Sequence, residues 1–87
     1  MKHNLKTAIV TGASRGIGRA TAIRLAQDFQ AIVLVARDAE TLDSAASEVR
    51  AKGATALALH LDLREPSASD IVIERTLDQF GRIDALV

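Results

Sequence analysis

Cysteine and tyrosine are absent from the 87-residue sequence, and its only aromatic residues are two phenylalanines. Without cysteine, neither a disulfide framework nor a thiolate metal site can form. The 11 basic and 11 acidic residues balance, and this neutrality, with so few aromatic side chains, argues against nucleic acid as the main partner. No apolar run approaches the roughly 18 residues that are needed to span a bilayer. The composition therefore favours a cytoplasmic protein without a membrane partner.

Apolar runs alternate with helical patterns along the chain. Runs rich in apolar and β-branched residues predict strands at residues 7–10, 31–35, 55–61 and 83–87. The segments between them predict helices that cover residues 17–28, begin after Asp38 and end before Gly53, and begin after Ser67 and end before Gly81. This order predicts an α/β fold with a Rossmann-like, doubly wound parallel sheet and right-handed crossovers. The alternation by itself implies no function.

Apolar stripes in the second and third predicted helices should face the sheet. In the second helix the stripe consists of Leu42, Ala45, Ala46 and Val49. In the third helix it consists of Ile73, Thr76, Leu77 and Phe80. Both helices are therefore expected to pack with these side chains against the strands.

A glycine-rich turn separates the first strand from the first helix. It runs Thr11-Gly12-Ala13-Ser14-Arg15-Gly16-Ile17-Gly18. The glycines let the backbone bend tightly and let a ligand approach without a Cβ in the way. The helix that begins there directs free amides and the positive end of its dipole toward that ligand, so a pyrophosphate fits. A glycine match alone is weak, but the flanking strand and helix supply the context that a dinucleotide site requires.

The spacing Gly-x-x-x-Gly-x-Gly, preceded by Thr11, resembles that of the short-chain dehydrogenase/reductase family. Further segments are similar to the same family and follow in its order: Val35-Ala36-Arg37-Asp38, His60-Leu61-Asp62-Leu63 and Gly81-Arg82-Ile83-Asp84-Ala85-Leu86-Val87. The resemblance covers the whole chain and implies that residues 1–87 form the N-terminal part of a single NADP-binding Rossmann domain. The parent protein would transfer hydride between a nicotinamide and a carbonyl or alcohol substrate. Glycine turns of this form occur in 3-oxoacyl-thioester reductases, which suggests that substrate class.

The residues of the glycine turn have separate expected roles. Gly12 would make the tight turn, Gly16 would let the pyrophosphate come close, and Gly18 would let the helix pack on the sheet. The amide of Ile17 could donate to phosphate, and the resemblance places its side chain near the nicotinamide. Ser14 could hydrogen-bond a phosphate or the ribose, although a solvated turn hydroxyl explains this residue nearly as well.

The end of the second strand favours NADP(H) over NAD(H). NAD-binding units usually carry Asp or Glu about 20 residues past the glycine turn, to bind the ribose 2′-hydroxyl, and Ala36 stands at that place. Arg37 follows, and Arg15 lies in the turn, so two guanidinium groups could hold a 2′-phosphate. The alternative is that both arginines are solvated loop charges. Asp38 could contact a ribose, but a helix N-cap explains it better.

Asp62 and Leu63 follow the third strand, at the edge where open parallel sheets bind ligands. The resemblance implies that the Asp62 side chain accepts a hydrogen bond from the adenine amino group and that Leu63 offers its backbone amide. An ordinary loop aspartate is the alternative for Asp62. We interpret His60 as a partly buried strand residue with no catalytic role.

The catalytic residues of the family have no counterpart in this sequence. The resemblance places an Asn-Asn-Ala-Gly turn, a serine and a Tyr-x-x-x-Lys pattern after the fourth strand, where this chain ends. We therefore assign no catalytic residue and no metal site, and expect the 87-residue chain alone to be inactive. Two alternatives stay open, a non-catalytic nucleotide-binding or assembly fragment, and an α/β domain whose turn holds another phosphate ligand. Family members are often dimers or tetramers, so a homo-oligomer is also open.

Overall fold

Strands and helices alternate in the order that the sequence predicts. The computed structural model describes residues 4–87. Its elements are β1 (Thr7–Thr11), α1 (Gly16–Leu25), β2 (Ala31–Ala36), α2 (Ala39–Ala51), β3 (Thr55–His60), α3 (Ala68–Phe80) and β4 (Ala85–Leu86). Across these described residues, no helix is long and apolar enough to cross a membrane.

The ends of two elements differ from the sequence prediction. Helix α1 ends at Leu25 rather than at residue 28, because the amides of Asp28 and Phe29 both donate to the Leu25 carbonyl at 2.9 Å and close a turn there. Strand β4 covers only Ala85 and Leu86 rather than residues 83–87, although the amides of Asp84 and Val87 also donate to β1 carbonyls. The predicted positions of the strands and helices are otherwise confirmed to within a few residues.

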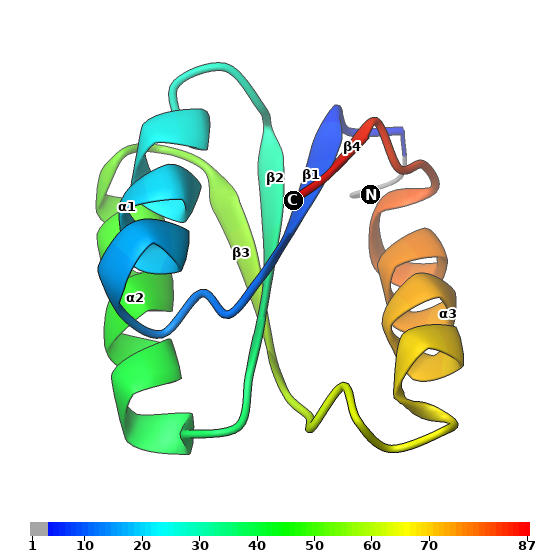
Figure 1. The fold of residues 1–87 in the computed structure, drawn as a ribbon. Coiled ribbons are helices and arrows are strands. Elements are labelled where there is room, and N and C mark those ends of the chain that lie inside the picture. Colours follow the sequence, from blue (N-terminus) through cyan, green and yellow to red (C-terminus); the bar gives the residue numbers. More distant parts are fainter. Residues whose placement is uncertain (1–3) are drawn as a thin grey trace.

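The strands of residues 4–87 form one parallel sheet in the order β3-β2-β1-β4. Helices α1 and α2 cover one face of this sheet and α3 covers the other, as Figure 1 shows. Strands β1 and β2 are therefore buried on both faces, which explains why their sequences are continuous apolar runs rather than alternating ones. The sheet is Rossmann-like and doubly wound, as predicted.

Successive residues of the central strands pack into separate cores on the two faces of the sheet. On the side of α1 and α2, Val10 and Leu34 pack with the predicted stripe of α2, which is fully buried. On the side of α3, Ile9 and Val33 pack with Phe80. The prediction for α2 is confirmed, and its cap is also as expected, since the Asp38 side chain accepts from the Glu40 amide at 3.2 Å.

The predicted stripe of α3 is only half right. The residues that this helix buries are Ala68, Val72, Thr76 and Phe80. Ile73 and Leu77 remain 49% and 44% exposed, because the helix is turned so that its i, i+4 row from residue 68 faces the sheet. The buried Thr76 hydroxyl is satisfied by donating to the Val72 carbonyl at 2.6 Å.

Asp84, just before β4, is hydrogen-bonded to Thr7 at the start of β1. The Thr7 amide donates to Asp84 Oδ2 at 2.8 Å, and the Asp84 amide donates back to the Thr7 carbonyl at 2.8 Å. Arg82 donates to the same carboxylate, with its Nε 2.9 Å from Oδ2. The Arg82 hydrogen bonds, followed by the Thr7 amide, hold the pKa of Asp84 below its usual value of 3.8.

Acid should therefore weaken the fold partly through Asp84. A carboxylate whose pKa is lowered by folding contributes stability that is present above pH 3.8 and is lost as the pH falls through the folded-state pKa. We expect the free energy of unfolding, measured by urea titration, to fall less steeply below that pH in Asp84→Asn than in the wild type. Asp78→Asn removes an exposed carboxylate of α3 as the control. Identical slopes for the wild type and Asp84→Asn would contradict this role.

Candidate functional site

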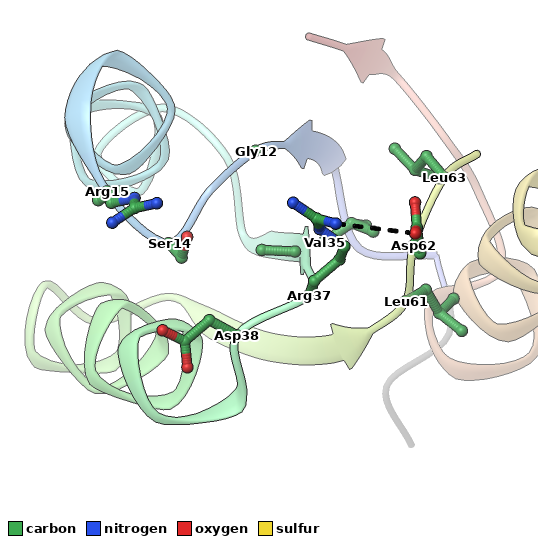
Figure 2. Close-up of a pocket in the computed structure, with 10 residues that line it drawn as sticks. Gly12, Ser14, Arg15, Val35, Arg37, Asp38, Leu61, Asp62 and Leu63 are labelled. Carbon is green, nitrogen blue, oxygen red and sulfur yellow. Dashed lines mark ion pairs between the residues drawn. The ribbon is translucent and has the colours of Figure 1, made fainter. Parts of the chain in front are cut away.

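An open pocket of about 520 Å³ lies at the carboxyl ends of β1, β2 and β3. It is lined by Gly12, Ser14, Arg15, Val35, Ala36, Arg37, Asp38, Leu61, Asp62 and Leu63 (Figure 2). The glycine turn and the ends of β2 and β3, which are far apart in the sequence, thus meet around one hollow. The structure gathers there most of the residues that the sequence analysis singled out, and leaves Gly16, Ile17 and Gly18 outside the lining.

The glycine turn exposes bare backbone at the start of α1. Gly12 and Gly16 both have a φ of +62°, in the left-handed region that favours glycine. A Cβ at Gly16 would meet no atom within 4 Å, so open space lies beside the backbone at the first residue of the helix. An anionic group could approach the helix N-terminus here, as the resemblance expects of a pyrophosphate.

The first turn of α1 is suited to an anion in charge as well as in shape. It contains no acidic residue, and its N-cap, Arg15, makes no side-chain capping hydrogen bond. The first amides of a helix have no partner within the helix. In α1 the Arg15 side chain does not accept from them either. The helix dipole and the arginine therefore add positive potential at the same end.

Gly18 lies close to the backbone of the glycine turn. A Cβ at this position would lie 2.0 Å from the Gly12 carbonyl oxygen and 2.7 Å from its carbonyl carbon. The nearest atoms belong to the glycine turn, so α1 and this turn approach each other closely at Gly18. Gly18 keeps the turn folded back onto the helix, which positions the bare backbone of the turn. Ile17, next to it, is 87% exposed.

Arg15 and Arg37 both border the pocket, from different elements (Figure 2). Arg15 comes from the glycine turn, and Arg37 follows β2, with its side chain 67% exposed. Ala36, before it, leaves the end of the strand without a carboxylate. The nearest acid along the chain, Asp38, is engaged in capping α2. The rim of the pocket at β2 thus has an alanine where a dinucleotide site for NAD would present an acid, and a guanidinium group at the next residue.

Asp62 lies beside Arg37 at the edge of the pocket and is held by an arginine that the sequence analysis missed. Arg64 donates from Nη2 to Asp62 Oδ2 at 2.9 Å and from its backbone amide to Oδ1 at 2.9 Å. These side-chain and backbone hydrogen bonds, with the charges of Arg64 and Arg37, lower the pKa of Asp62 to about 2. The Asp-x-Arg spacing after the third predicted strand was the signal that could have revealed this pair.

His60 differs from the prediction of a partly buried residue. It is exposed at the end of β3, because β3 is the edge strand of the sheet. Its Nε2 lies 3.0 Å from Asp43 Oδ1 of α2. His60 is not among the residues that line the pocket.

Comparison with known proteins gives a family and a set of homologous structures. The family model for short chain dehydrogenases matches residues 6–87. Hydroxysteroid dehydrogenase-like protein 2 of Xenopus tropicalis is 41% identical in an alignment 88 positions long, which covers 93% of this chain and 21% of that protein. The 3-oxoacyl-[acyl-carrier-protein] reductase of Synechocystis is 41% identical over 83 residues, 94% of this chain and 34% of the reductase. The chain thus spans about a fifth to a third of the length of these curated relatives.

Among solved structures, L-sorbose reductase of Gluconobacter frateurii, complexed with NADPH and L-sorbose, superimposes with a TM-score of 0.87 at 38% identity. A xylitol dehydrogenase bound to NAD⁺ gives a TM-score of 0.88, also at 38% identity. Each match covers 99% of this chain and 33% of the other. These homologues carry a nicotinamide dinucleotide of either kind. The chain belongs to the short-chain dehydrogenase family of oxidoreductases.

Proposed function

We propose that this chain forms the adenosine and pyrophosphate side of a dinucleotide site that prefers NADP(H) to NAD(H). The observation that carries the proposal is that Arg15 and Arg37 both line one pocket whose β2 rim has Ala36 in place of an acid. A 2′-phosphate between these arginines would accept charge-assisted hydrogen bonds. An Asp or Glu at position 36 would repel that phosphate, whereas alanine does not.

The other pocket residues and the adjoining start of α1 fit the rest of the cofactor. The bare backbone of Gly12 and Gly16 and the first amides of α1 would bind the pyrophosphate, with the Ser14 hydroxyl as a further donor. At the end of β3, Asp62 would accept from the adenine amino group and Leu63 would offer its amide. The nicotinamide, when bound, supplies the hydride carrier, and the Ile17 side chain would lie on its side of the site.

The parent protein would reduce a carbonyl or oxidise an alcohol. The match to about a fifth to a third of the relatives' length supports reading residues 1–87 as the N-terminal part of a single Rossmann domain. The serine, tyrosine and lysine of the family would then lie outside this segment. The Synechocystis relative, at 41% identity, supports a 3-oxoacyl thioester as the substrate, and a chain limited to these 87 residues would be inactive.

An acid introduced at position 36 tests the cofactor preference. Ala36→Asp puts a carboxylate where it would accept from a ribose 2′-hydroxyl and repel a 2′-phosphate. We expect the affinity for NADPH to fall about tenfold, while that for NADH is kept or rises, in calorimetric titrations at one low ionic strength. Ala20→Asp adds the same charge to an exposed position of α1 as the control. An Ala36→Asp variant that still prefers NADPH as strongly as the wild type does would contradict the proposal.

A further inference from the structure

Arg64 has no part in the proposed site, yet its guanidinium group binds both carboxylate oxygens of Asp62, which does belong to the site. Its Nε lies 3.1 Å from Asp62 Oδ1 and its Nη2 lies 2.9 Å from Oδ2. Its backbone amide also donates to Oδ1 at 2.9 Å. Both oxygens of Asp62 are therefore engaged by a single neighbouring residue.

A second arginine competes for the same carboxylate. Arg37 Nη1 lies 3.9 Å from Asp62 Oδ2, beside it at the edge of the pocket (Figure 2). This separation is too long for a hydrogen bond, so Arg37 keeps its donors available. The Asp62 side chain is 27% exposed, and those of Arg37 and Arg64 are 67% and 76% exposed. Of these three side chains, Asp62 is thus the least free to move, and the two arginine side chains can move more easily.

The competition matters because Arg37 is the residue proposed to hold a 2′-phosphate. If Asp62 were unsatisfied, its carboxylate would draw Arg37 toward it and would repel an incoming phosphate. The bidentate Arg64 pair is the stronger and more directional of the two contacts. This pair neutralises the charge of Asp62 and leaves the donors of the Arg37 guanidinium group available for a ligand. The Asp62 carboxylate is ionised at neutral pH, since its pKa is about 2.

We propose that Arg64 is a positioning residue for cofactor preference, which holds Asp62 in a bidentate pair and thereby keeps Arg37 free for a ligand 2′-phosphate. This inference rests on the proposed function, since it concerns the same 2′-phosphate site. It differs from a direct contact, because Arg64 acts through Asp62. Removing Arg64 should therefore harm binding only as long as position 62 carries a negative charge.

The test compares two probes that differ by the 2′-phosphate alone, adenosine 2′,5′-bisphosphate and adenosine 5′-monophosphate. The measured quantity is the ratio of their affinities, obtained by calorimetry at low ionic strength, where an exposed ion pair is least screened. We expect Arg64→Ala to lower this ratio roughly two- to fivefold, the range for one exposed ion pair. Adding Asp62→Asn to Arg64→Ala should restore the ratio, because asparagine has no charge with which to hold Arg37.

Two further variants separate this effect from general damage. Arg24→Ala breaks an exposed pair of the same kind on α1, Arg24 Nη1 to Asp28 Oδ2 at 2.9 Å, and should leave the ratio unchanged. Arg64→Gln keeps the aliphatic stem and an amide donor but removes the charge, and should lower the ratio as Arg64→Ala does.

The outcomes distinguish the inference from the function on which it rests. An unchanged ratio in Arg64→Ala and Arg64→Gln overturns the role of Arg64 and leaves the proposed function standing. A lowered ratio that Asp62→Asn does not restore also overturns it, because Arg64 would then contact the phosphate or support the loop. A wild type that shows no preference for the bisphosphate overturns the proposed function, and the inference falls with it.

Discussion

Gly18→Ala should destabilise the protein by about 3 kcal/mol or more, because the added methyl group has no room. Its carbon would stand 2.0 Å from the Gly12 carbonyl oxygen and 3.3 Å from the Ala13 Cα. Both neighbours belong to the backbone of the glycine turn, so they cannot rotate away as a side chain would. Alanine in place of glycine would favour a helix by about 1 kcal/mol, which is too little to offset the clash. Urea unfolding followed by circular dichroism measures the difference.

Gly53→Ala is the matched control for that experiment. Gly53 has a φ of +98° and no atom within 4 Å of the position that a Cβ would take. Its replacement therefore introduces backbone strain without a clash, and should cost about 1–2 kcal/mol. A Gly18→Ala variant as stable as Gly53→Ala, or more stable, would show that the turn can move away from α1. The position of the pocket backbone would then not depend on Gly18.

Arg37→Ala should weaken NADPH binding about tenfold and change NADH binding by less than about twofold. A hydrogen bond to a charged group contributes about 1.5–3 kcal/mol, and we take the lower end because the Arg37 side chain is 67% exposed. About 1.4 kcal/mol corresponds to a tenfold change in affinity. Calorimetric titration of the variant with both cofactors measures these changes in affinity. The loss of NADPH affinity should become smaller as salt is added.

Arg75→Ala is the control, since Arg75 is exposed on α3, which covers the other face of the sheet (Figure 1). It should leave both affinities unchanged. An equal loss of NADPH and NADH binding in Arg37→Ala would mean that this arginine supports the shape of the pocket. It would not then select the 2′-phosphate, and the NADP preference would need another origin.

The fold was largely predictable because its signals are local. Residues 31–35 are an uninterrupted apolar run, which is typical of a strand buried on both faces, and β2 is such a strand. Asp38 and Gly81 mark helix ends by their own chemistry, one through a capping carboxylate and the other through a left-handed φ of +82°. The pocket followed from the same logic, because the carboxyl ends of parallel strands meet at one edge of the sheet.

The errors concern relations between elements that no local pattern encodes. Val72 and Ile73 are equally apolar, so the sequence could not show that α3 turns the first toward the sheet and leaves the second exposed. His60 was misjudged because its exposure depends on β3 being an edge strand. Each of these features is decided by packing rather than by sequence spacing.

Titration of the unmodified protein with NADPH and with NADH, by calorimetry at one ionic strength, tests the central claim most directly. The claim is that Arg15 and Arg37, with no acid at Ala36, make the pocket select a 2′-phosphate. It predicts that NADPH binds about tenfold more tightly than NADH or better, the effect of one or more charge-assisted hydrogen bonds. Equal affinities, or tighter binding of NADH, would contradict the claim and would leave both arginines as solvated charges at the rim of the pocket.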